Sequence, residues 1–204
     1  MDLSKALGQI AEIHGHLART EVYRASRSPT MAATGVLALF TAMLQPTLSP
    51  GLSAWQLVQV WVSVACVNLA LVLGEIGYHY LFSYGQSERR MTRHVLTQFA
   101  PSLGAGAVLT ISFITSSPHQ VDLLPGLWAL VFGLGIFAAR PYLVHGMGWV
   151  ALFYLVAGGV LISMAGHDVP VNSWAMGGTF GFGQLFMALV LYWRLERKEN
   201  VWNR

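Results

Sequence analysis

Six long apolar runs alternate with short polar connections along the chain. Each run approaches or exceeds the roughly 20 helical residues that cross a hydrocarbon core of about 30 Å. A backbone in lipid must satisfy its own hydrogen bonds, and a helix does so within one segment. The pattern therefore predicts an all-α integral membrane protein with a six-transmembrane-helix bundle over residues 31–196. The predicted spans are 31–48, 55–81, 95–115, 123–139, 147–165 and 174–193.

An amphipathic segment precedes the first span. Its apolar positions recur at alternating spacings of four and three residues, which is typical of a helix with one apolar stripe, and Pro29 ends the pattern. Residues 1–30 are therefore expected to form an amphipathic cytoplasmic or interfacial helix. This helix could lie on the membrane surface, cover the ends of the spans or pair with another copy, and the sequence does not choose among these. The stripe consists of Leu3, Leu7, Ile10, His14 and Leu17.

Basic residues mark every second connection. Lys and Arg occur in the N-terminal segment, after the second and fourth spans and in the C-terminal segment, whereas the connections after the first, third and fifth spans contain none. The positive-inside rule then places both termini in the cytoplasm, with residues 197–204 as a cytoplasmic tail. The expected location is the plasma (inner) membrane. The basic residues of the internal connections are Arg89, Arg90, Arg93 and Arg140.

Composition agrees with a membrane protein. Hydrophobic residues make up 54% of the chain and charged residues 10%, and the mean hydropathy is +0.53, which lies outside the usual range of soluble domains. The formal net charge is +3, but the basic residues form short clusters rather than one long basic face. We therefore expect the lipid bilayer, and not nucleic acid, as the partner. Cys66 is the single cysteine, so an intramolecular disulfide is excluded.

The second span carries polar residues well inside its apolar part. Asn68, Glu75 and His79 fall within about 40° of one another on a helix, so they form one polar stripe. An ionisable group at membrane depth is costly and is by default a candidate functional site. The opposite face of this helix is polar too, which predicts that protein surrounds it. The residues of that face are Gln56, Gln59 and Ser63.

Glu75 has two predicted roles. A carboxylate at this depth must be paired, hydrated or neutralised by a proton. Arg140 falls at the same predicted membrane face, and His79 lies one turn away on the same helix. The first interpretation is a structural ion pair of Glu75 with Arg140 or His79. The second is a ligand- or ion-coupling site formed by Asn68, Glu75, His79 and Arg140.

Polar side chains in other spans are expected to hydrogen-bond across to the second span. In lipid such bonds contribute about 0.6 kcal/mol each. They are Gln98, Thr110 and Ser112 in the third span and Gln184 in the sixth.

A metal or haem site is a further, less favoured interpretation. Glu75, His79, His94 and His145 share the predicted cytoplasmic face and provide ligand types that zinc and iron accept. Glu75 and His79 form one i,i+4 pair without an H-E-x-x-H signature, and the other histidines come from separate connections. The sequence therefore leaves the cofactor unknown.

Glycines are concentrated in the later spans. Gly177 and Gly181 have the spacing that lets two helix backbones approach closely in a membrane. We expect this face to serve packing inside the bundle, with a subunit interface of a homo-oligomer as the alternative.

Three functions remain open from the sequence. The leading one is a non-enzymatic membrane protein that binds or translocates a small molecule or ion within the bundle, with Glu75 as the coupling carboxylate. The second is an accessory or sensory subunit whose N-terminal helix contacts a membrane or cytoplasmic protein partner. The third is a membrane-embedded metal or haem enzyme. The chain contains neither a G-x-S-x-G nucleophile motif nor a Gly-rich phosphate loop, which favours a non-enzyme.

Overall fold

A computed structural model of the chain describes residues 28–48, 51–165 and 173–196. The amphipathic helix predicted for residues 1–30 falls almost entirely outside these residues, as does the predicted tail over 197–204. Within the described part all regular structure is helical, and six helices are long and apolar enough to cross a membrane. The predicted all-α, six-span architecture is confirmed, and the chain is a multipass membrane protein.

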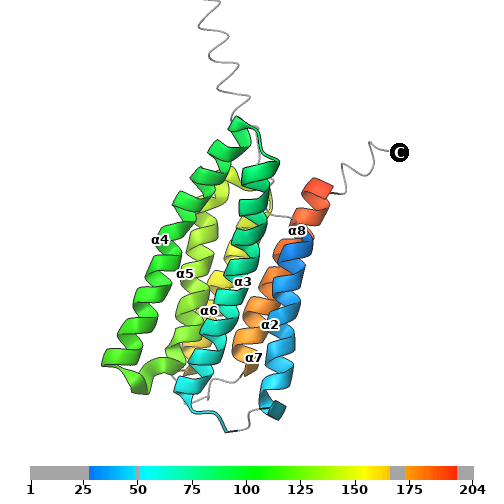
Figure 1. Cartoon of the computed structure of the whole chain (residues 1–204). Helices are drawn as coiled ribbons and strands as arrows, with labels where there is room; N and C mark the ends of the chain where they lie inside the picture. The colour runs from blue at the N-terminus through cyan, green and yellow to red at the C-terminus, as the bar shows by residue number, and fades with distance from the viewer. Residues whose placement is uncertain (1–27, 49–50, 166–172, 197–204) are drawn as a thin grey trace, which may run out of the picture.

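The helices run alternately up and down in one bundle (Figure 1). The turn between the second and third spans, the connection after the fourth and the end of the sixth lie together at one end, here called the basic end because it carries Arg89, Arg140 and Arg194. In chain order the elements are α2 (Ser28–Leu48), α3 (Ala54–Phe82), α4 (Gln86–Ser116), η1 (Pro118–Leu123), α5 (Leu124–Ala139), η2 (Arg140–Tyr142), α6 (Met147–Ala165), α7 (Ser173–Met176), η3 (Gly177–Gly181), α8 (Phe182–Leu191) and η4 (Tyr192–Glu196).

The third helix begins earlier than the sequence predicts. The stretch before residue 95 looked like a long polar connection, yet α4 starts at Gln86. The Gly85 N–H donates to a carboxylate oxygen of Glu88 at 3.0 Å, and the Arg89 N–H donates to the Gly85 carbonyl at 3.1 Å. This local capping satisfies donors that a helix start leaves open, so the helix forms before the apolar residues begin. The prediction of a long loop here was wrong.

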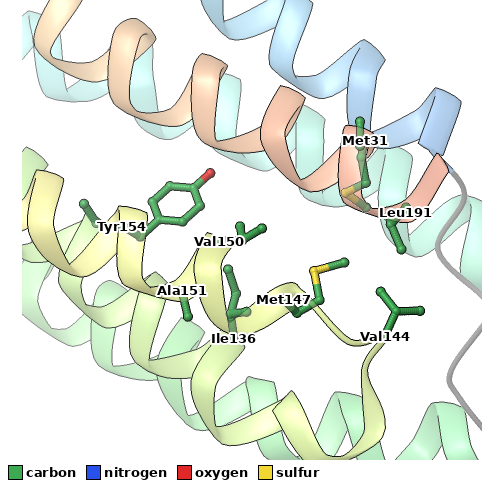
Figure 2. Packing of buried hydrophobic residues seen from close by; sticks show 10 residues of the cluster. Met31, Ile136, Val144, Met147, Val150, Ala151, Tyr154 and Leu191 are labelled. Atoms are coloured by element: carbon green, nitrogen blue, oxygen red, sulfur yellow. The ribbon is translucent and has the colours of Figure 1, made fainter. Parts of the chain in front are cut away.

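Helices α5 and α6 pack closely through glycine. A Cβ added at Gly126 would lie 2.8 Å from the Gly158 carbonyl oxygen, and one added at Gly158 would lie 2.7 Å from the Gly126 carbonyl oxygen. Lipid supplies no hydrophobic drive between helices, so such backbone contact provides the packing that holds them together. The main core cluster lies on the inner side of this pair toward the basic end and includes Ile136, Val150 and Tyr154 (Figure 2).

Helices α3 and α4 are much less covered than the others. Only 11% of the apolar stretch of α3 is buried, and none of that of α4. Gln56, Gln59 and Ser63 are exposed on α3. The expectation that protein surrounds α3 was therefore wrong for the single chain, because only one face of this helix packs against the bundle.

Candidate functional site

The inward face of α3 carries a row of polar atoms without partners. Trp61, Asn68 and Glu75 follow one another at intervals of seven residues, so they share a face and rise by about 10 Å per interval. In each of them one polar atom is buried and has no hydrogen-bond partner within the part of the chain that the structure describes: Nε1 of Trp61, Oδ1 of Asn68 and Oε2 of Glu75. Nearly all buried polar atoms in proteins are hydrogen-bonded. Three in succession therefore need partners that the described residues do not supply.

Packing against the bundle decides which way this row points. Trp61, the first residue of the row, is buried with an exposure of 2%, whereas Leu73, which lies about 160° around the helix from Glu75, is 44% exposed. Val72, one turn from Glu75, packs against the main core cluster. The helix has apolar residues on all sides and polar residues on two opposite faces, so amphipathicity does not orient it and the contacts of its buried residues do.

Helices α8 and α2 bring further side chains of the same kind. The Oε1 atoms of Gln184 and Gln45 are buried and have no hydrogen-bond partner over residues 28–48, 51–165 and 173–196. Gln184 lies near the middle of the sixth span, as Asn68 does in α3, while Phe182 on the outer face of α8 is 57% exposed. The interior therefore contains unpartnered amide oxygens at a similar depth on two helices.

Tyr154 of α6 is the most enclosed of these polar groups. Its side chain is fully buried, and none of the described residues forms a hydrogen bond with its hydroxyl. Figure 2 shows the ring pointing from α6 toward the sixth span, where a Cβ added at Gly183 would lie 2.4 Å from the hydroxyl oxygen. The glycine thus makes the space that the tyrosine occupies.

Aromatic rings from two other helices lie against the ring of Tyr154. The ring centroid of Tyr154 lies 4.9 Å from that of Phe132 and 5.6 Å from that of Phe180, and those two phenylalanines lie 6.0 Å apart. Phe180 belongs to η3, a π-helical turn whose glycines approach α2. π-Helical turns recur at functional sites because they redirect side chains. Here the π-helical turn contains Phe180, whose ring lies next to that of Tyr154.

Glu75 is not paired with the cations expected for it. Among the described residues it forms no ion pair. Arg140 is exposed, with its guanidinium carbon 5.7 Å from the Phe137 ring centroid, and so is turned along α5 rather than toward α3. The ring of His79 stacks on that of Tyr84 at 5.7 Å. The ion-pair interpretation of Glu75 is therefore not supported by the geometry.

The four candidate metal ligands do not gather into a site. His94 is exposed and stacks on Tyr142 with a centroid distance of 5.5 Å, and His145 is exposed. Over the described ranges no group of three His, Cys, Asp or Glu side chains is placed to hold a metal ion. Glu75 and His79 thus remain neighbours on one helix without further ligands.

The close-approach glycines contact the first span. A Cβ added at Gly177 would lie 2.2 Å from the Ala42 Cβ, and one added at Gly181 would lie 2.5 Å from a side-chain carbon of Leu39. A Cβ added at Gly35 would in turn lie 2.9 Å from the Gly181 carbonyl oxygen. This glycine face is used for packing between α2 and the sixth span inside the chain.

The hydrogen bonds predicted across to the second span are not formed. Thr110 accepts a bond of 2.9 Å from the indole N–H of Trp128 on α5, and Gln98 and Ser112 are exposed. Gln184 is placed inward but leaves its Oε1 unpartnered. The polar side chains of α3 therefore form fewer hydrogen bonds with the other described helices than the sequence predicts.

Two residues of the interior escape sequence reasoning. Trp61 lies seven residues before Asn68, so extending the polar stripe by one heptad would have found it. Tyr154 has no such signal, because a tyrosine within an apolar span has the composition of an ordinary core residue. Comparison with known proteins finds no matching family model, no matching curated protein and no matching solved structure.

Proposed function

We propose that this membrane protein binds, and moves across part of the membrane, a small molecule or ion within the helix bundle, with Glu75 as the coupling carboxylate. One observation carries the proposal: the row of buried, unpartnered polar atoms on Trp61, Asn68 and Glu75. The row covers about 21 Å of a hydrocarbon core of roughly 30 Å. A ligand or its water shell would supply the missing partners.

The positions of the other candidate residues fit a path toward the basic end. His79 lies one turn beyond Glu75 on α3 and is half-buried. Arg140 is exposed and follows Ala139, which packs in one cluster with Ile76 of α3. A ligand that leaves Glu75 toward this end would meet His79 next and the exposed basic residues last. Asn68 and Gln184 would contact the ligand near the middle of the bundle.

The substitution Glu75→Gln tests the proposal. It keeps the shape of the side chain and removes its charge. Thermal melts of the purified full chain are measured with a panel of inorganic salts and small organic acids, amines and neutral solutes. We expect at least one member to raise the melting temperature of the parent protein, because binding to the folded state stabilises it. That rise should be absent in Glu75→Gln.

Glu88→Gln is the matched control. The same chemical change is made at the exposed start of α4, where glutamine still caps the helix, so the ligand response should persist. Without ligand, Glu75→Gln should be at least as stable as the parent, because no ion pair is lost. A loss of about 3–5 kcal/mol would instead indicate a broken buried ion pair. An unchanged response of Glu75→Gln to every compound would refute the proposed function.

A further inference from the structure

We propose that the interior site takes an organic cation with apolar substituents, held by Glu75 and by the aromatic side chains of the bundle. This inference rests on the proposed function and names the chemical class of its ligand. It follows from the charge of the site, from the small number of oxygen ligands in it and from the aromatic character of its surroundings.

The charge of the ligand follows from Glu75. Among the described residues Glu75 is the only acidic side chain well inside a span, since Glu88 starts α4 and Asp122 lies in η1. No cation of the described ranges is paired with it. An anionic ligand would place a second negative charge beside the Glu75 side chain, and a neutral ligand would leave that carboxylate unpaired. A cation satisfies it.

The oxygen atoms near Glu75 are too few for a bare metal ion. Calcium takes six to eight oxygen ligands and magnesium six, in nearly ideal geometry. The buried oxygen atoms without partners among the described residues belong to Glu75 and Asn68 of α3, Gln184 of α8, Gln45 of α2 and Tyr154 of α6. They come from four helices, and Asn68 lies about 10 Å along α3 from Glu75. The described residues contain no cluster of three metal-ligating side chains. An organic cation needs no such shell, because its charge is satisfied by one carboxylate and by ring faces.

Aromatic side chains pack near both ends of the row on α3. Next to Glu75, Tyr84 and Tyr142 pack against the buried cluster that contains Ile76. Other rings lie at the far end of the row, about 21 Å away. Trp61 is buried in a cluster with Ala38 and Met176, against which Trp128 and Phe180 pack. Phe180 also packs against the main core cluster, where it adjoins Tyr154. Ring faces attract cations, and apolar walls desolvate a ligand's substituents. The surroundings therefore suit a cation that carries its own apolar surface.

Two probes of the same size and opposite charge test the inference. Tetraphenylphosphonium and tetraphenylborate are titrated separately into the full chain in lipid nanodiscs, with empty nanodiscs subtracted, and tryptophan fluorescence is recorded. We expect tetraphenylphosphonium to bind at least tenfold more tightly than tetraphenylborate. Glu75→Gln should weaken tetraphenylphosphonium binding at least tenfold, and Glu88→Gln should leave it unchanged. Glu75→Asp keeps the charge and should retain most of the affinity.

The outcomes separate this inference from the proposed function. Equal binding of both probes, or tetraphenylphosphonium binding that survives Glu75→Gln, would overturn the cation assignment. If a metal ion, an anion or a neutral solute instead binds in a Glu75-dependent way, the inference is wrong and the proposed function stands. If no compound shows Glu75-dependent binding, both are wrong. Should Glu75→Gln fail to fold, Asn68→Leu provides the second variant, with the same tenfold loss expected and an unchanged affinity overturning the inference.

Discussion

Replacing Gly183 by alanine tests the contact between α6 and the sixth span. The added Cβ would lie 2.3 Å from Cζ and 2.4 Å from the hydroxyl oxygen of Tyr154, whereas ordinary van der Waals contact begins at 3.4 Å. The ring must therefore move by about 1 Å in a close-packed interior. It has little room to do so, because it is fully buried and the rings of Phe132, Phe153 and Phe180 lie against it.

The expected cost is that of overpacking a core, about 1–3 kcal/mol. Alanine also has a higher helix propensity than glycine, which by itself stabilises the helix by up to about 1 kcal/mol. Gly159→Ala on α6 measures this gain in helix propensity alone, because an added Cβ there has nothing within 4 Å. Gly183→Ala should therefore be less stable than Gly159→Ala by about 1–3 kcal/mol.

Reversible unfolding in mixtures of mild detergent and dodecyl sulfate, followed by circular dichroism, measures the difference. A double-mutant cycle identifies its cause. In a Tyr154→Leu background the clash is absent, so Gly183→Ala should lose most of its penalty, with a coupling free energy of about 0.5–3 kcal/mol. Equal stability of the Gly183 and Gly159 variants, or strictly additive effects in the cycle, would refute the packing of Tyr154 against Gly183.

Three further predictions concern packing and topology. Gly177→Ala should destabilise the protein in the same unfolding assay, because its Cβ would lie 2.2 Å from a side chain of α2. Gly178→Ala should not, because an added Cβ there has nothing within 4 Å. Similar stabilities of the two variants would contradict this packing. A topology reporter fused after Arg204 should face the cytoplasm and one inserted within 169–173 the opposite side, and an outward C-terminus would contradict the predicted orientation. Deleting residues 1–22 should leave the helical content and melting of the bundle unchanged, because the spans satisfy their own backbone hydrogen bonds; a truncated chain that cannot be purified folded would show that the segment belongs to the core.

The sequence by itself determined the number and nature of the spans. In lipid, a helix is the simplest structure in which a single segment forms all of its own backbone hydrogen bonds. The bilayer thickness sets the length of that helix, so long apolar runs are enough to locate the spans. The predicted bounds of the fifth span coincide with those of α6 (Met147–Ala165). The sequence also singled out Asn68 and Glu75, because polar residues stand out in an apolar run. It missed the early start of α4, where the capping of Gly85 by Glu88 outweighs the polar composition.

Only the tertiary structure decided what each helix faces. Helix α3 carries polar residues on two opposite faces, so its sequence does not say which side meets the bundle. The burial of Val58, Trp61 and Ile76 does. The same applies to Tyr154, whose place depends on a glycine of another helix. The rotation of a membrane helix about its axis is set by the fit of side chains between neighbours, since lipid contacts its apolar faces equally well. For that reason the sequence identifies Glu75 as a polar residue inside a span. That its expected ion pair is not formed among the described residues is seen only in the packed bundle.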